Sequence, residues 1–202
     1  MMRKISIDRK TKETKISLNI NLDGSGKSEI STKIPFFDHM LEQISMHGLI
    51  DLSIKCDGDI EVDYHHTIED VGLTIGQAIR EALGDKKSIK RFSNSYVAFD
   101  ETCTRTVIDL CNRPFFIWKT GTSLEQVGGI DVELFSEFFK SLVNEAKMNC
   151  HIENIYGKNN HHIIESCFKS FALALRSAIE VDPRKKTIPS SKGALWKKKL
   201  LV

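Results

Sequence analysis

The amino-acid sequence predicts an α+β fold formed by internal duplication, with two similar sheet-plus-helices halves packed about a pseudo-twofold axis. The first observation is that the pattern His-His-x-Ile-Glu occurs twice, at residues 65–69 and 161–165, nearly half of the chain apart. The second is that a similar order of segments surrounds each copy: two strands, a helix, a strand and a second helix. We expect a predominantly antiparallel sheet in each half, with its helices on one face.

The first half begins with alternating apolar residues at 5–7 and 16–22, which predict two strands joined by a charged connection. From Pro35 the apolar residues recur with helical spacing as far as Gly48, which we expect to end the helix. Residues 49–54 alternate again and predict a third strand. A helix then begins at the first His-His pair and is closed by Gly84.

The second half repeats this plan, with strands predicted at residues 96–99, 104–110 and 150–155 and a helix at 132–142. Gly157 predicts a turn, after which a helix begins at the second His-His pair. We expect a single domain over residues 1–202, made of two repeats at about 1–92 and 93–193, followed by a short basic tail.

Composition excludes several classes of protein. The 29 basic and 27 acidic residues leave a net charge of only +2, which argues against nucleic acid as a partner. The basic runs at residues 184–186 and 197–199 lack interleaved aromatic residues and predict solvated surface. The five scattered cysteines form no Cys-x-x-Cys, the first 14 residues lack a signal-peptide core, and no apolar run could span a membrane. We therefore expect a soluble, cytoplasmic protein that binds no membrane.

Both His-His-x-Ile-Glu copies are candidate metal sites. Residues four apart lie on one face of a helix, so His65 with Glu69, and His161 with Glu165, could each hold one ion, while His66 and His162 point elsewhere. The simplest arrangement is two metals, each served by both copies. The alternative for one copy alone is a pair of surface histidines at a helix start, but two copies favour metal.

The helix before each copy offers one further ligand. His39 in the first half matches Glu137 in the second, and imidazole and carboxylate are interchangeable ligands for a borderline metal. Either side chain could instead be a solvated helix residue. On the metal interpretation each half supplies four ligands, namely His39, His65, His66 and Glu69 in the first and Glu137, His161, His162 and Glu165 in the second.

Four stretches together give the chain a family resemblance: IPFFDHML (residues 34–41), DYHHTIED (63–70), GKNNHHIIE (157–165) and IPSSKG (188–193). They resemble the signatures of the imidazoleglycerol-phosphate dehydratases of histidine biosynthesis, over nearly the whole chain. The resemblance implies a hydro-lyase that removes water from imidazole glycerol phosphate to give imidazole acetol phosphate. It also implies two Mn²⁺ per active site and assembly into a 24-subunit shell with the sites between subunits.

Carried over by position, the resemblance assigns a ligand set to each metal. The first set is His39, His66, His161 and Glu165, and the second is His65, Glu69, Glu137 and His162; many members carry His in place of Glu137. The substrate contacts would be Glu13, Gln43, His47, Arg91, Arg113, Lys169, Ser191 and Lys192, with Ser190 beside them in the same loop. His39, Gln43 and His47 share one helix face, which could be a ligand followed by substrate contacts or a solvated stripe.

The reaction removes a hydroxyl and a carbon-bound hydrogen that no carbonyl acidifies, so two cations on the substrate's imidazole would supply the driving force. The catalytic residues would be the ligands of the two motifs together with Glu13, which lies outside both ligand sets and is the candidate for acid–base work. The alternative for Glu13 is a loop carboxylate paired with Lys10, Lys12 or Lys15. Two other classes remain open: a dinuclear metallohydrolase, and a scaffold whose metals only join subunits.

Overall fold

The computed structural model describes residues 3–121 and 125–196, so the predicted basic run at 197–199 lies outside the described residues. The first half consists of β1 (Lys4–Lys10), β2 (Thr14–Asn21), β3 (Ser28–Ser31), α1 (Pro35–Gly48), β4 (Asp51–Gly58) and α2 (His65–Leu83). The second half consists of β5 (Phe92–Phe99), β6 (Thr102–Asp109), β7 (Phe115–Lys119), the short pair β8 (Gln126–Val127) and β9 (Ile130–Asp131), α3 (Val132–Ala146), β10 (Asn149–Tyr156) and α4 (Asn160–Ile179).

The two main sheets have the same topology, which confirms the predicted duplication. Their strand orders are β1-β2-β4-β3 and β5-β6-β10-β7. In each, three strands are antiparallel, and the edge strand, β3 or β7, runs parallel to its neighbour. The sequence reasoning missed both edge strands. β3 is a polar tetrapeptide without an alternating pattern, and β7 is a nearly continuous aromatic run rather than an alternating one.

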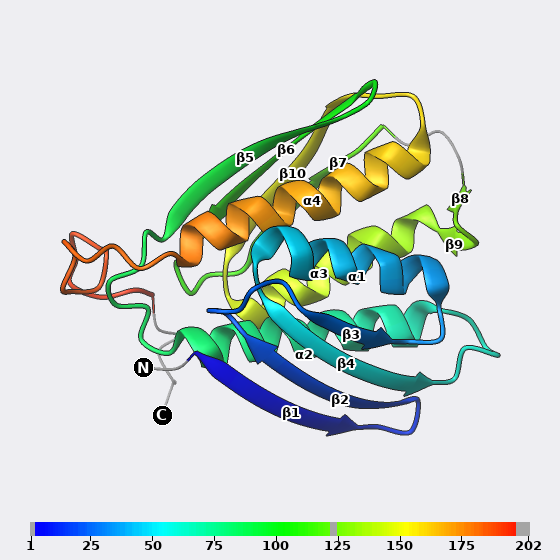
Figure 1. Ribbon diagram of the computed structural model, residues 1–202, viewed down its shortest axis with the longest axis horizontal. Helices are drawn as coiled ribbons and strands as arrows, with labels where there is room; N and C mark the ends of the chain where they lie inside the picture. Colours follow the sequence, from blue (N-terminus) through cyan, green and yellow to red (C-terminus); the bar gives the residue numbers. More distant parts are fainter. Residues whose placement is uncertain (1–2, 122–124, 197–202) are drawn as a thin grey trace.

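The helices form the middle of the molecule, between the two sheets (Figure 1). α2 covers the first sheet and α4 covers the second, while α1 packs beside α4 and α3 beside α2. The four helices of the described residues run in the same direction and begin at one end of the molecule, on the right in Figure 1. The side chains near their N-termini, including every predicted metal ligand, are therefore gathered toward that end.

The core shows how the halves correspond. Phe37, Met40 and Leu41 of α1 are fully buried, and so are Phe135, Phe138 and Phe139 at the matching positions of α3. Phe138 stacks on Phe168 of α4 with ring centroids 5.4 Å apart. The same register places His39 opposite Glu137 in the alignment of the halves, as the sequence predicts.

The helix ends follow local chemistry. Pro35 occupies the first turn of α1, where its missing N–H costs nothing. The side chain of Asn159 caps α4 by accepting from the backbone N–H groups of His161 and His162. The predicted end of α1 is correct, but Gly48 is the last helical residue, and Leu49 adopts the left-handed conformation with φ of 51°. None of the helices within the described residues combines the length and apolar character needed to cross a bilayer.

Two glycines let α2 and α3 approach each other closely. A methyl group on Gly72 would lie 2.6 Å from the carbonyl oxygen of Phe138, and one on Gly76 would clash with the carbonyl oxygen of Leu142. We expect Gly76→Ala to lower the free energy of unfolding by about 2 kcal/mol, because overpacking outweighs the gain in helix propensity. Chemical denaturation measures the change. Gly121→Ala, whose added methyl group meets no atom of the described residues within 4 Å, is the control and should leave the stability unchanged.

Candidate active site

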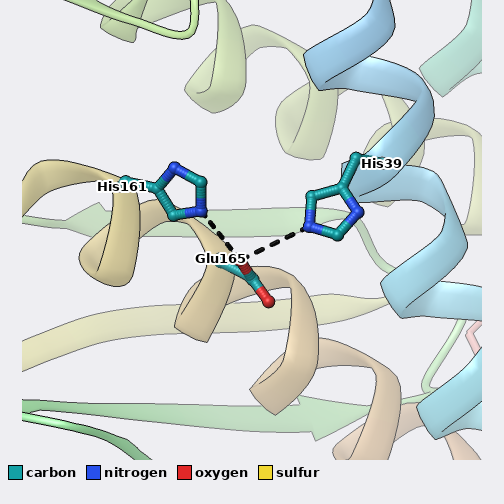
Figure 2. Close-up of side chains that lie close together, drawn as sticks. All are labelled: His39, His161 and Glu165. Atoms are coloured by element: carbon teal, nitrogen blue, oxygen red, sulfur yellow. Dashed lines mark hydrogen bonds and ion pairs between the residues drawn. The ribbon is translucent and has the colours of Figure 1, made fainter.

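Three predicted ligands come together from two helices. His161 Nε2 lies 3.0 Å and His39 Nε2 lies 3.6 Å from the same oxygen, Oε2 of Glu165. Figure 2 shows Glu165 between the two imidazoles, with His39 reaching across from α1. The three ligand atoms lie within 4.8 Å of one another and are the only such group of three or more among the described residues. Two imidazole nitrogens and a carboxylate are a donor set that suits a borderline divalent metal, so these residues fit an ion.

The surroundings keep Glu165 ionised. Its side chain is only 7% exposed, and this burial opposes ionisation. The ammonium group of Lys169, 2.7 Å from Oε1, and the hydrogen bond with His161 outweigh burial, so the pKa of Glu165 lies below its usual value. Lys169 also lies over the ring of Phe99 at 4.1 Å from the centroid, which fixes its position. A charged carboxylate is thus available to a metal on its Oε2 side.

The stripe of α1 that follows His39 packs toward α4. Gln43 is buried and donates from Nε2 to the carbonyl oxygen of His39 at 3.1 Å. Burial, helped by the charge of Lys169, lowers the pKa of His47. Gln43 is therefore not part of a solvated stripe, and the stripe faces the same space as Glu165 and Lys169.

The ligands of the first half lie around the start of α2. His65 Nε2 is 3.7 Å from Glu69 Oε2, as their helical spacing predicts. His66 Nδ1 donates to Asp59 at 3.0 Å, which raises the pKa of His66, and its Nε2 lies 3.8 Å from Oε1 of Glu13. Glu13 is half-exposed on the β1–β2 turn. Within the described residues, the ion pair of Glu13 is with His66 and not with Lys10, Lys12 or Lys15.

The remaining two predicted ligands have other partners. His162 Nδ1 donates to Glu101 at 2.8 Å, and Glu101 also accepts from the backbone N–H groups of Lys158 and Asn159. These hydrogen bonds, that from Asn159 first, hold the pKa of Glu101 well below its usual value. Glu137 pairs with Lys140 one turn further along α3. Within one chain, therefore, His66 does not join the first ligand set, and the second set does not gather into a group.

The side chains expected to bind the substrate's phosphate are Arg91, Arg113, Lys169 and the loop of Ser190, Ser191 and Lys192. All but Lys169 gather elsewhere, whereas Lys169 pairs with Glu165. Arg91, Arg113 and the loop of Ser190, Ser191 and Lys192 line a cavity of about 370 Å³. Arg91 is held there by Asp109 at 2.7 Å and donates to the carbonyl oxygen of Pro189 at 2.8 Å. Cationic and hydroxyl donors converging on one cavity are suited to an anion such as a phosphate.

This basic cavity and the His39–His161–Glu165 cluster lie at opposite ends of α4. The backbone N–H of Arg91 donates to the carbonyl oxygen of Ala178, near the last turn of α4, whereas His161 is in its first turn. The helix between these points is about 25 Å long. One small molecule cannot reach both places within a single chain.

Sequence reasoning missed two carboxylates of the site, Asp59 and Glu101. One signal for Glu101 was available, because it stands directly before the second strand of its half, as Glu13 does in the other half. Asp59 follows Gly58, and nothing in the hydrophobic pattern distinguishes it from an ordinary turn residue.

Comparisons with known proteins give a consistent result. A family model described as Imidazoleglycerol-phosphate dehydratase matches residues 32–175. Curated proteins of that name from Hydrogenovibrio crunogenus and Marinobacter nauticus are each 51% identical to this chain over 96% of its length, and the matches cover 100% and 98% of their own lengths. The crystal structure of the protein of that name from Staphylococcus aureus matches with a TM-score of 0.81 and 36% identity, covering 89% of this chain and 99% of the other. A structure from Pyrococcus furiosus matches with a TM-score of 0.81 and 32% identity, covering 94% and 100%.

Proposed function

This chain belongs to the imidazoleglycerol-phosphate dehydratase family of hydro-lyases, and from that premise we propose that it removes water from imidazole glycerol phosphate to give imidazole acetol phosphate in histidine biosynthesis. The observation that carries the proposal is the gathering of His39, His161 and Glu165 beside Lys169, which supports three of the four residues of the predicted first ligand set. We place the reaction in the cytoplasm, because all five cysteines are free.

We further propose that two Mn²⁺ ions serve each active site. The residues that would hold them are His39, His66, His161 and Glu165 for one ion and His65, Glu69, Glu137 and His162 for the other. When bound, the ions would supply positive charge that favours the deprotonated form of the substrate's imidazole ring. The donor set of the His39–His161–Glu165 cluster supports the first assignment.

Side chains of the chain itself would transfer the proton, keep Glu165 charged and bind the phosphate. Glu13 would move the proton of the substrate carbon, because it is half-exposed and its Oε1 lies 3.8 Å from His66 Nε2, at the edge of the ligand set. Lys169 would hold Glu165 ionised. The cavity formed by Arg91, Arg113, Ser191 and Lys192 would bind the phosphate, with Arg91 oriented by Asp109.

The separation of about 25 Å between these two places supports an active site shared between subunits, as in a symmetric shell of 24 copies. Exposed apolar side chains on one sheet also support self-association. The outer face of the second sheet exposes Phe92, Tyr96, Val107 and Phe115, while no large apolar side chain is exposed on the described strands of the first sheet. Contiguous exposed apolar side chains mark interaction surfaces.

Mixed assemblies test the shared site. His161→Ala and Arg113→Ala should each be inactive alone. Co-expressed in equal amounts, they should recover about a quarter of wild-type turnover, because one site in four would combine an intact cluster with an intact basic cavity from another subunit. Turnover of the purified mixed assemblies measures this. If both parts of a site came from one chain, every site would carry a lesion and no activity would return.

The activity itself is tested by product formation. Purified protein is incubated with Mn²⁺ and imidazole glycerol phosphate, and the ketone product and free phosphate are both quantified. Ketone formation that stops on chelation of the metal is the expected result. Release of phosphate would identify a hydrolase. If neither product formed, the result would favour a scaffold whose metals only join subunits.

A further inference from the structure

Two carboxylates outside the predicted ligand sets hold the second histidine of each pair. His162 Nδ1 lies 2.8 Å from Glu101, and His66 Nδ1 lies 3.0 and 3.2 Å from the two oxygens of Asp59. A carboxylate can only accept, so in both neutral rings the proton must sit on Nδ1. The lone pair of Nε2 is then free in both histidines, and Nε2 is the atom left to bind a metal.

We propose that Glu101 and Asp59 are positioning residues that fix the tautomer and orientation of His162 and His66, so that each ring presents Nε2 to a metal. The proposal rests on the proposed function, because it assigns a role toward the same ions. Metal-binding histidines usually donate their other ring N–H to a carboxylate or carbonyl group, and loss of that partner weakens metal binding about 10- to 100-fold.

Glu101 is itself fixed with its two oxygens in different roles. Oε1 accepts from the backbone N–H groups of Lys158 at 3.1 Å and Asn159 at 2.7 Å, and from the hydroxyl of Thr102 at 3.1 Å. Oε2 faces the His162 ring. The loop before α4 thus orients the carboxylate, and the carboxylate orients the ring.

Asp59 is held differently, because both of its oxygens face the His66 ring. Its own backbone N–H donates to the carbonyl oxygen of Glu13. The carboxylate group of Asp59 could therefore rotate by half a turn about its Cβ–Cγ bond and still present an oxygen to Nδ1 of His66.

The two halves use residues from different places in the repeat to hold Nδ1 of the histidine. Glu13 precedes β2 and Glu101 precedes β6, so they are counterparts in the duplication, and the residues that follow them, Thr14 and Thr102, are both buried. In the second half Glu101 accepts the hydrogen bond from Nδ1 of His162. In the first half Asp59 accepts the hydrogen bond from Nδ1 of His66, which leaves Glu13 near Nε2 and free to exchange protons.

The counterpart of Asp59, after Gly157, is Lys158, which offers no side-chain acceptor. In the second half Asp100 takes the place near Nε2, with Oδ2 3.8 Å from Nε2 of His162, so each half sets one carboxylate against Nδ1 and a second near Nε2.

Glu101→Gln separates positioning from simple bracing of the loop. The backbone N–H groups of Lys158 and Asn159 can only donate, so they keep the amide oxygen of the new side chain at the Oε1 position. Its NH₂ group must then face His162 Nδ1 and donate to it, which moves the ring proton to Nε2 and blocks metal binding. Asp59→Asn has no such constraint and should keep the tautomer of His66.

The tautomers are measured by ¹⁵N NMR of the histidine side chains in the metal-free protein, with His162→Gln assigning the signal. Mn²⁺ affinity is measured by titration of the same samples. For Glu101→Gln we expect His162 to change to the Nε2–H form and Mn²⁺ affinity to fall about tenfold or more. Asp59→Asn should have the smaller effect, and Glu81→Gln, an exposed residue of α2 paired with Gln77, should match wild type.

An unchanged tautomer with Mn²⁺ affinity within about twofold of wild type in Glu101→Gln would overturn the proposal and leave Glu101 as a loop brace. Because the NMR measurement needs neither substrate nor turnover, this result is distinguishable from a failure of the proposed dehydratase activity.

Discussion

Replacing Glu165 with glutamine is expected to abolish metal binding at the His39–His161–Glu165 cluster and to lower turnover about a thousandfold or more. Glu165 contacts both imidazoles of the cluster and the partly buried ammonium of Lys169. The neutral amide removes the negative charge that a cation needs and leaves Lys169 without its ion-pair partner. Metal content per chain, measured by mass spectrometry of the purified protein, should fall by about half if two ions are bound.

The control for Glu165→Gln is Glu81→Gln, which makes the same chemical change at an exposed position. Because unpairing Lys169 also destabilises the fold, circular dichroism should be recorded for both variants at the assay temperature. A folded Glu165→Gln protein that retains full metal content and near-normal turnover would remove this cluster from the active site.

Replacing Glu13 with glutamine is expected to leave metal content intact and to lower turnover about a hundredfold or more. The Glu13 carboxylate lies beside His66 but belongs to neither ligand set. Asp59, and not Glu13, accepts the hydrogen bond from Nδ1 of His66. The amide keeps the size of the side chain but cannot accept a proton at neutral pH. Steady-state kinetics with a parallel metal analysis measures the two effects separately.

Asp8→Asn, an exposed charge on the same β1–β2 hairpin, is the matched control and should retain wild-type kinetics. Near-normal turnover of Glu13→Gln would exclude Glu13 from proton transfer. A loss of metal together with activity would instead make it part of a ligand set.

Much of the fold was predictable because its elements have strong periodic patterns. All four helices and their starts were predicted, and the buried triplets of α1 and α3 repeat with the same spacing. The edge strands β3 and β7 were missed, because a partly exposed edge strand needs no alternating pattern. The end of α1 at Gly48 was predicted, but the left-handed conformation after it, at Leu49, was not, because it is adopted by a residue other than glycine.

The site was predictable only within single helices. The i,i+4 spacing correctly predicted that His65 lies by Glu69 and His161 by Glu165, because helical geometry fixes those distances. The contact of His39 with Glu165 depends on how α1 packs against α4, which periodicity does not encode. Asp59 and Glu101 lie in turns, where local sequence carries no such rule. The grouping of His66 with the first set, and of the second set as a whole, stays a prediction.

The common direction of the four helices has a consequence for the origin of the chain. A rotation that exchanges the halves yet keeps every helix pointing the same way must turn about an axis roughly parallel to the helices. Such an axis brings both copies of the histidine motif to one pole of the molecule, whereas an axis across the helices would send them to opposite poles. A half-length ancestor that paired with itself in this manner would already have held its two motifs at a common pole before the genes were fused.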